Sequence, residues 1–151
     1  MIVPRVEPSA AGALPGRGRF SPIERVALTL EVTLAYAHAR HRLRHSPLES
    51  VLSSLRARFV PRAAPPADGT LAHARRLGRV VARVLGILPG DTRCLVRSLV
   101  LTQLLARRGI ATTLVIGART SPDFLAHAWV EYDGEPVLSP GDGSFGRLAE
   151  L

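Results

Sequence analysis

The sequence predicts an α+β fold in which a lobe of helices precedes a core made of one central helix and a small antiparallel sheet. Residues 21 to 88 show only helix start signals and helical apolar spacing. After residue 91, one strongly apolar helical stretch is followed by three short strand-like stretches. A run of helices followed by a run of strands is typical of the α+β class.

Size and composition set the expected domain organisation. The chain has 151 residues, enough for one ordinary core and too few for two. Its 46% hydrophobic and 21% charged content is that of a globular protein. We expect a flexible tail over residues 1–20, which are rich in Pro and Gly, and a single domain over 21–151. That domain divides into the helical lobe (21–88) and the core (91–151).

The formal net charge is +8, and every basic residue is Arg. A basic surface attracts acidic partners such as an acidic peptide or nucleic acid, although the absence of Lys also fits a bias in coding. The single cysteine excludes an internal disulfide, and the N-terminus lacks the apolar region of a secretion signal. We therefore expect a cytoplasmic location. No uncharged run reaches the ~20 residues that span a bilayer, so no membrane span is expected.

Three helices are expected before residue 89. Ser21-Pro22 with Glu24 forms a capping signal for a helix that runs to about residue 44. Ser46-Pro47 repeats the signal for a short helix to about residue 58, and a third helix runs from Thr70 to about residue 88. One apolar stripe of the first helix is expected to face the core: Ile23, Val26, Ala27, Leu30 and Leu34.

The same helix carries three histidines, His38, His41 and His45, at spacings that put them on one face. A metal site is disfavoured there because neighbouring Arg residues repel a cation and no carboxylate or cysteine completes the ligand set. An exposed polar face is the preferred interpretation. No metal site is predicted.

The central helix is predicted over residues 92–108, and it is apolar on most sides. Asp91 or Thr92 can cap its free N–H groups, which places Cys94, the only cysteine, in the first turn. The partial positive charge at a helix start favours a thiolate over a thiol. Cys94 is therefore a candidate nucleophile, although a lone cysteine is often a small core residue.

Three strands are expected after this helix. Residues 111–118 are rich in Thr, Val and Ile, and residues 126–132 form the second strand. Asp133-Gly134 is a signal for a two-residue hairpin, so residues 135–139 should return antiparallel. His127 begins the second strand and is the only histidine outside the helical lobe. One imidazole can deprotonate a thiol and later protonate a leaving amine.

Several motifs in this order resemble the transglutaminase-like cysteine peptidases of lasso-peptide biosynthesis, the leader peptidases related to microcin-processing proteins. The resemblance covers about residues 91–138 closely and the preceding helices more loosely. It is carried by Cys94-Leu95-Val96-Arg97-Ser98-Leu99, Leu104-Leu105-Ala106-Arg107-Arg108-Gly109-Ile110, Val115-Ile116-Gly117, Phe124-Leu125-Ala126-His127-Ala128-Trp129-Val130-Glu131 and Asp133-Gly134.

The resemblance implies a papain/transglutaminase-like core in which Cys94 is the nucleophile and His127 the general base and acid. The implied reaction removes the leader from a ribosomally made lasso-peptide precursor. The implied partners are the precursor's leader, a separate leader-recognition protein and an asparagine-synthetase-like macrocyclase. No cofactor is evident, and the sequence leaves open whether the reaction needs a nucleotide.

The third catalytic residue departs from the family pattern. The family's aspartate, about a dozen residues after the histidine, falls here on Ser139. If the hairpin is regular, His127 lies opposite Pro140 and Asp142 lies on the face of His127. A bulge would reverse this assignment and favour Ser139. We predict that Asp142 orients His127, with Ser139 as the alternative. Trp129 is either a shield for the ion pair or a core residue.

Two other readings stay open. The chain could be a catalytically degenerate basic module that binds an acidic peptide or nucleic acid, since the expected aspartate is missing and the charge is high. A cysteine enzyme could also transfer its acyl group to an amine instead of to water.

Overall fold

The computed structural model describes residues 21–47, 50, 53, 69–87 and 94–151. The helices are α1 (Pro22–His45), α3 (Thr70–Ile87) and α4 (Cys94–Arg107). The strands are β1 (Thr113–Arg119), β2 (Leu125–Tyr132), β3 (Glu135–Pro136) and β4 (Gly146–Glu150). They form one antiparallel sheet in the order β3-β2-β1-β4. The predicted α+β class is confirmed.

Several predicted features fall outside the described residues. They are the tail 1–20, most of the short helix after Ser46-Pro47, and the segment 88–93 with the proposed caps Asp91 and Thr92.

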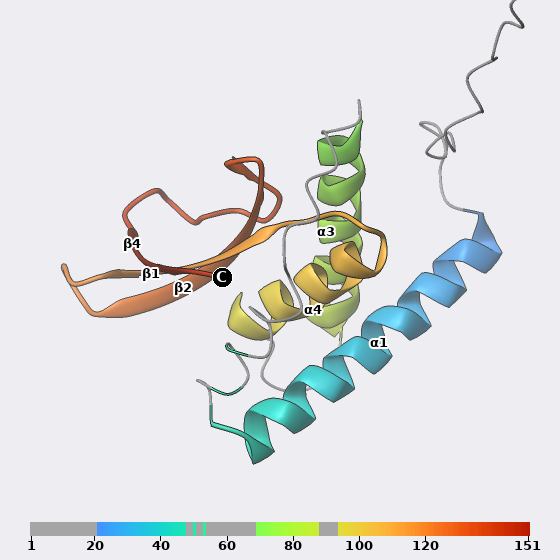
Figure 1. Cartoon of the computed structure of the whole chain (residues 1–151), viewed down its shortest axis with the longest axis horizontal. Helices are drawn as coiled ribbons and strands as arrows, with labels where there is room; N and C mark the ends of the chain where they lie inside the picture. The colour runs from blue at the N-terminus through green and yellow to red at the C-terminus, as the bar shows by residue number, and fades with distance from the viewer. Residues whose placement is uncertain (1–20, 48–49, 51–52, 54–68, 88–93) are drawn as a thin grey trace, which may run out of the picture.

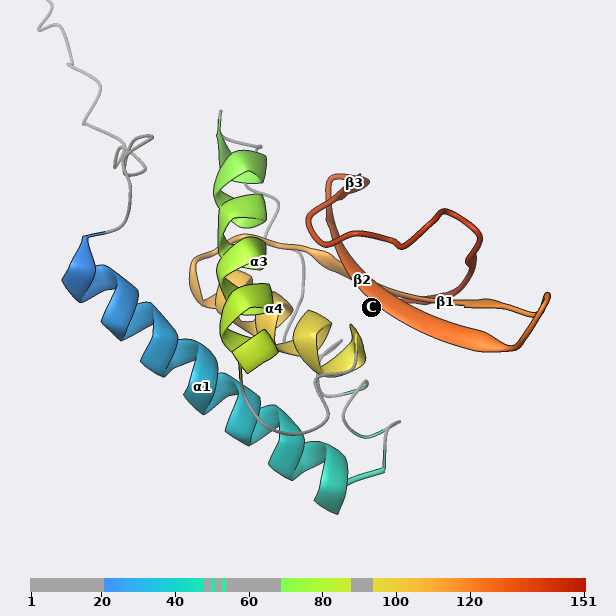
Figure 2. The same ribbon diagram turned by 180° about the vertical axis from the view of Figure 1, so that it is seen from behind.

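Helix α4 lies at the centre of the molecule. Helices α1 and α3 pack on it from one side, and the sheet packs on it through β1 and β2 (Figures 1 and 2). Leu99, Val100, Leu101, Leu104 and Leu105 are all buried, because α4 is covered on most of its circumference. The predicted central helix is confirmed, and it connects the helical lobe to the sheet.

The hairpin between β2 and β3 follows the predicted register at its turn. Asp133 (φ 52°) and Gly134 (φ 77°) both take positive φ, as a two-residue turn of this kind requires, and Tyr132 pairs with Glu135. The returning strand is shorter than the predicted 135–139, because β3 contains only Glu135 and Pro136. The fourth strand, β4, was not predicted and pairs with the other edge of β1.

The predicted orientation of α1 is wrong. The stripe expected in the core is exposed: Ile23 is 82% exposed, Val26 71%, Leu30 59% and Leu34 61%. The buried face is the opposite one: Leu28, Val32, Ala35, Tyr36 and Ala39. Because α1 has apolar residues on two opposite faces, its spacing allows two stripes. The chosen face carries small alanines, which let α1 approach its neighbours closely.

An ion pair between the two helices accompanies this orientation. The Glu31 carboxylate accepts hydrogen bonds from Arg108, the residue after α4, at 2.6 Å and 3.2 Å, and Arg107 lies 3.8 Å from it. Two parallel bonds from one guanidinium fix both distance and angle. The charge of Glu31 therefore helps to set which face of α1 meets the rest of the protein.

We expect Leu28→Ala and Leu30→Ala, two substitutions in the same helix, to differ sharply in stability. Leu28 is 6% exposed and Leu30 is 59% exposed. Truncating Leu28 leaves a cavity and should lower the free energy of unfolding by about 2–3 kcal/mol, whereas Leu30→Ala should change it by less than about 0.5 kcal/mol. Urea unfolding followed by circular dichroism measures both. Equal losses would mean that the exposed stripe of α1 is covered in solution.

No helix in the described part of the chain combines the length and apolarity needed to cross a membrane.

Candidate active site

Cys94 is the first residue of α4, is half-buried, and packs against the hydrophobic core. Ser98, one helical turn further on and about 6 Å along the axis, is fully buried. Its Oγ donates a hydrogen bond of 3.0 Å to the backbone carbonyl of Ala128 in β2. This bond fastens the N-terminal end of α4 to the residue next to His127, and the two elements lie side by side in Figures 1 and 2.

His127 is half-buried in β2, opposite Gly117 of β1. Its Nε2 lies 3.1 Å from the backbone carbonyl oxygen of Ser139. A carbonyl oxygen can only accept, so Nε2 carries the proton in this contact and donates it. In the neutral ring, Nδ1 then holds the free lone pair. The structure therefore selects Nδ1 of His127 as the atom available to accept a proton.

The strand register explains why Ser139 reaches the histidine. The N–H groups of Val137 and Leu138 both donate to the Val130 carbonyl, at 2.8 Å and 3.2 Å. Two residues thus oppose one, as in a bulge, and the regular register that would put His127 opposite Pro140 is lost. The alternative with a bulge is the one that the structure adopts. It brings Ser139 to the ring through its backbone, while the Ser139 Oγ accepts from the Gly141 N–H at 3.2 Å.

Asp142 has other partners. Its carboxylate accepts hydrogen bonds from the Ser144 hydroxyl, from the Ser144 N–H at 3.0 Å and from Arg119 Nη1 at 3.2 Å. These bonds, from Ser144 above all, lower the pKa of Asp142, and the charge of Arg119 adds to the effect. In the described part of the chain no hydrogen bond joins Asp142 to His127. The structure brings Ser139, and not Asp142, to the histidine ring.

Two aromatic rings lie near His127. The Trp129 ring is 6.0 Å from it, centroid to centroid, and inclined by 21°; the Phe145 ring is 5.1 Å away and inclined by 36°. Gly117 makes room for Trp129, because a Cβ at that position would lie 2.9 Å from the indole and 2.9 Å from the Gly146 carbonyl oxygen. Phe145 follows a glycine-rich stretch, and no motif in the sequence pointed to it.

Glu131 binds the indole N–H of Trp129. Its carboxylate, in a residue only 7% exposed, accepts from Trp129 Nε1 at 2.7 Å and from both Nη atoms of Arg147, at 2.8 Å and 3.1 Å. Burial alone would raise the pKa of Glu131, but the hydrogen bonds from Arg147 and Trp129, together with the charge of Arg147, outweigh it and lower the pKa. Glu131 thus positions the indole beside His127, and it does not contact the imidazole.

The lowered pKa of Glu131 leads to a prediction of how the stability of the fold depends on pH. A carboxyl with a lowered folded-state pKa stabilises the fold above its ordinary pKa of 4.5 and loses that contribution as pH falls through the folded-state value. Removing the buried charge in Glu131→Gln should cost about 1–3 kcal/mol at neutral pH, and the unfolding curves of the two proteins should converge in acid. Thermal unfolding from pH 7 to pH 3 tests this. Glu135→Gln, which removes an exposed pair with Arg75, serves as the control.

Cys94 and His127 are not joined by a hydrogen bond in the described structure. Such catalytic hydrogen bonds are often long without substrate and tighten when it binds. The backbone N–H of Cys94 lies in the first turn of α4, where it has no partner within the helix and can face a developing oxyanion. The structure therefore places the two candidate residues on two elements, α4 and β2, that the Ser98 hydrogen bond joins.

The described residues contain no group of three His, Cys, Asp or Glu side chains that could hold a metal ion. In α1 the rings of His41 and His45 lie 4.5 Å apart. Among the described residues, these two and His38 do not form a cluster that could hold a metal ion.

A search of curated proteins and of solved structures finds no match to the chain. A family model described as the transglutaminase-like superfamily matches residues 33–150, which is more than half of the sequence. The matched region contains α3, α4 and the whole sheet, with Cys94 and His127. Proteins of this superfamily are generally cysteine peptidases or acyltransferases. The chain belongs to the transglutaminase-like superfamily.

Proposed function

We propose that the protein is a cysteine peptidase that removes the leader from a ribosomally made lasso-peptide precursor. The observation that carries the chemistry is the hydrogen bond between His127 Nε2 and the Ser139 carbonyl, because it leaves Nδ1 free as a base. The docking of the start of α4 on β2 through Ser98 supports the pairing of this base with Cys94. The substrate class comes from the resemblance of the motifs around these two residues.

The proposed reaction uses one proton carrier. His127 Nδ1 takes the thiol proton of Cys94, and the sulfur attacks the scissile carbonyl carbon to give a tetrahedral oxyanion. The oxyanion collapses, the C–N bond breaks, and the imidazolium returns its proton to the leaving amine. Water, deprotonated by His127, then attacks the thioester, and the acid is released with the thiol restored. The Cys94 N–H supplies one hydrogen bond to the oxyanion.

In this proposal, His127 is oriented by a backbone carbonyl and not by a carboxylate. A buried carboxylate holds the imidazole in one tautomer and also stabilises the imidazolium by its charge. The Ser139 carbonyl fixes the tautomer in the same way but offers only a dipole. We expect the ion pair between Cys94 and His127 to be weaker than in a protein with the aspartate, so that the enzyme depends more on substrate binding to bring the two side chains together.

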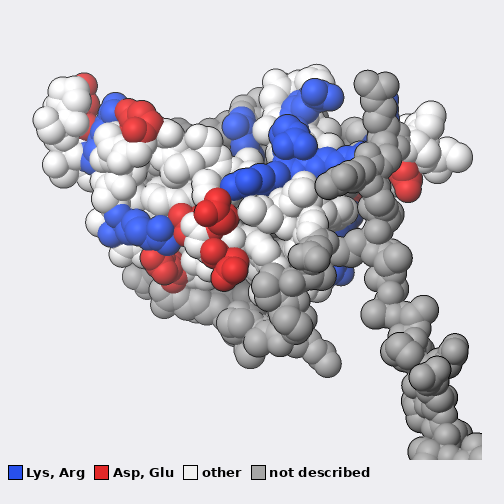
Figure 3. Space-filling model, turned by 90° about the horizontal axis from the view of Figure 1, so that it is seen from above, with Lys and Arg blue, Asp and Glu red and all other residues white. Residues whose placement is uncertain are grey.

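The partners follow from the same proposal. A separate leader-recognition protein would present the precursor, and an asparagine-synthetase-like macrocyclase would consume the trimmed peptide. We place the reaction in the cytoplasm, where a single cysteine stays reduced. Arg side chains form a band on the face shown in Figure 3, with acidic side chains at its edge, and this band would favour an acidic stretch of the precursor.

The test combines the full chain with a precursor and its leader-recognition protein and identifies the products by mass spectrometry. Two fragments whose masses add up to the precursor plus one water support hydrolysis. A leader whose new C-terminal carbonyl is joined to a supplied peptide amine, formed in place of the free acid, would identify acyl transfer instead. The alternative is a catalytically degenerate basic module, which the missing aspartate suggests. An uncut precursor, together with binding of nucleic acid that weakens steeply with salt, would favour that alternative. Adding and omitting ATP tests the nucleotide requirement.

A further inference from the structure

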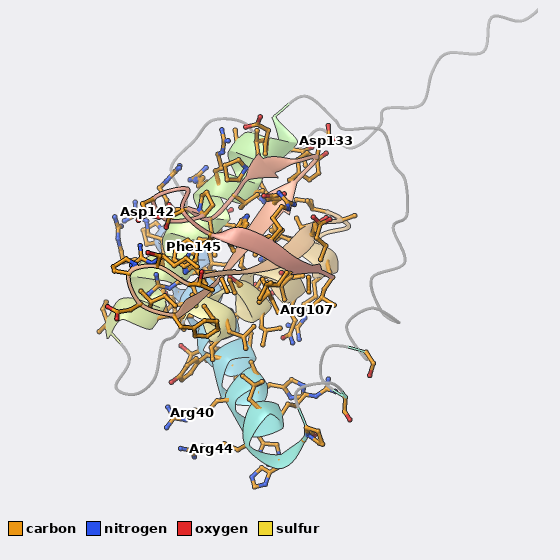
Figure 4. The ribbon with its side chains drawn as sticks, turned by 90° about the vertical axis from the view of Figure 1, so that its left-hand side faces the viewer. Arg40, Arg44, Arg107, Asp133, Asp142 and Phe145 are labelled. Atoms are coloured by element: carbon orange, nitrogen blue, oxygen red, sulfur yellow. The ribbon has the colours of Figure 1, made fainter. Side chains whose placement is uncertain are left out.

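We propose that Phe145 is a positioning residue for His127, and that Asp142 acts through Arg119 and Ser144 to hold Phe145 in place. The inference rests on the proposed role of His127 as the base. In this proposal Asp142 acts on His127 indirectly, through Phe145, and does not contact the imidazole itself. Asp142 and Phe145 lie close together at one side of the sheet, away from Asp133 at the hairpin turn (Figure 4).

The segment 139–146 is fastened at both ends. At its start, the Ser139 carbonyl accepts from His127 Nε2, and at its end Gly146 pairs with Ala118 of β1. Phe145 directly precedes that second anchor. Its ring lies 5.1 Å from the imidazole, which is the range of an aromatic pair. The segment therefore contributes both a hydrogen bond and a ring contact to the same histidine.

The middle of the segment is held by an ion pair. Arg119, the last residue of β1, donates to Asp142 at 3.2 Å and to the Ser144 hydroxyl at 3.3 Å. Its guanidinium carbon also lies 5.5 Å from the centre of the Phe145 ring. A cation over an aromatic face is attracted to it. Arg119 thus contacts Phe145 directly and also bonds the side chains of Asp142 and Ser144.

Gly141 fits the same arrangement. It has a φ of +86°, which favours glycine, and a Cβ there would lie 2.9 Å from the Phe145 ring and 3.8 Å from Cδ2 of His127. The backbone of Gly141 therefore packs closely against the two rings. Any larger residue would push Phe145 away from the histidine.

This packing has a direct consequence for the base. An imidazole held by one hydrogen bond can still rotate about χ2 and exchange its tautomer with water. Phe145 restricts that rotation, and so keeps Nε2 on Ser139 and Nδ1 available. In Phe145→Ala we expect the ring to sample both tautomers, and kcat to fall by roughly 10- to 100-fold with little change in KM, as small losses of alignment do.

Imidazole nitrogen NMR of the full chain tests the positioning without any substrate, with the signals of His127 identified by their loss in His127→Gln. The proposal expects a single Nε2–H tautomer in the wild type and in Phe145→Tyr, and mixed tautomers in Phe145→Ala. Asp142→Asn should shift the tautomers in the same direction but less. Leu148→Ala, at a position 69% exposed in the same strand as Gly146, is the control and should match the wild type.

The result that overturns the proposal is a Phe145→Ala protein whose tautomer signals equal those of the wild type. Mixed tautomers in the Leu148→Ala control would also overturn it, because the effect would then not be specific to Phe145. A substrate-contact role is separated by kinetics, since it would raise KM and leave kcat and the tautomer unchanged. If only the proposed peptidase function is wrong, the tautomer signals would still change in Phe145→Ala as expected, but the precursor would stay uncut.

Discussion

Cys94→Ala should abolish cleavage of the precursor while the fold persists. Without the thiol there is no nucleophile for the acyl intermediate, and the rate should fall by roughly 10⁴-fold or more, as it does when a catalytic nucleophile is removed from a hydrolase. The substitution removes one sulfur atom from a half-buried position at the first turn of α4, where alanine is a good helix former. The loss should therefore be in kcat and not in stability.

Mass spectrometry of the products and a urea unfolding curve, recorded on the same sample, separate the two effects. Cys94→Ser is a useful companion, because it keeps the size and replaces sulfur by a weaker nucleophile. Ser98→Ala is the matched control on the same face of α4. It removes the bond to the Ala128 carbonyl but leaves the thiol, so it should lower stability and reduce cleavage only in part. Full cleavage by Cys94→Ala would disprove the assignment of the nucleophile.

The sequence predicted those parts of the fold that depend on strong local signals. The start of α1 is one, since Ser21 and Glu24 form the expected capping box with bonds of 3.2 Å and 2.7 Å. The turn at Asp133-Gly134 is another, because its two residues tolerate the positive φ that the turn needs. The apolar character of α4 likewise indicated a buried central helix.

The errors arose where several local patterns are possible and tertiary packing decides between them. Both sides of α1 are apolar, so spacing could not say that Val32 is buried and Leu30 exposed. The choice depends on the packing of α1 against α3 and α4, which are distant in the sequence. Strand β4 contains Gly146 and charged residues, and it forms only because the edge of β1 is available for pairing.

In the candidate site, too, the residues with local signals were predicted and the contacts that depend on tertiary structure were not. Cys94 and His127 could be named from motifs, because a cysteine at a helix start and a histidine at the start of a strand are local features. Ser139 was predicted only as the alternative to Asp142, because its contact with His127 is made by a backbone atom and depends on a bulge opposite Val130. A backbone carbonyl carries no signature in the sequence. The roles proposed for Cys94 and His127 themselves stay predictions that the substitutions test.

His127→Ala should have the second largest effect on activity and should also change the reactivity of Cys94. Loss of the general base and acid should lower kcat by about 10³-fold, within the range for a positioned proton carrier. Because His127 would also hold the thiolate as its counter-ion, alkylation of Cys94 by iodoacetamide near pH 6 should slow in the variant and recover at alkaline pH. The alkylation measurement needs no precursor.

His41→Ala is the matched control, since His41 lies in α1 on the exposed face beyond the apolar stripe. It should leave both cleavage and alkylation unchanged. A comparison with Asp142→Asn and Ser139→Ala then separates the possible orienting groups. If the Ser139 carbonyl orients the ring, Ser139→Ala keeps most of the activity because the backbone is unchanged, and Asp142→Asn loses far less than His127→Ala. A loss in Asp142→Asn as large as the loss in His127→Ala would instead mean that the carboxylate reaches the imidazole during the reaction, with the segment 139–146 rearranged around substrate.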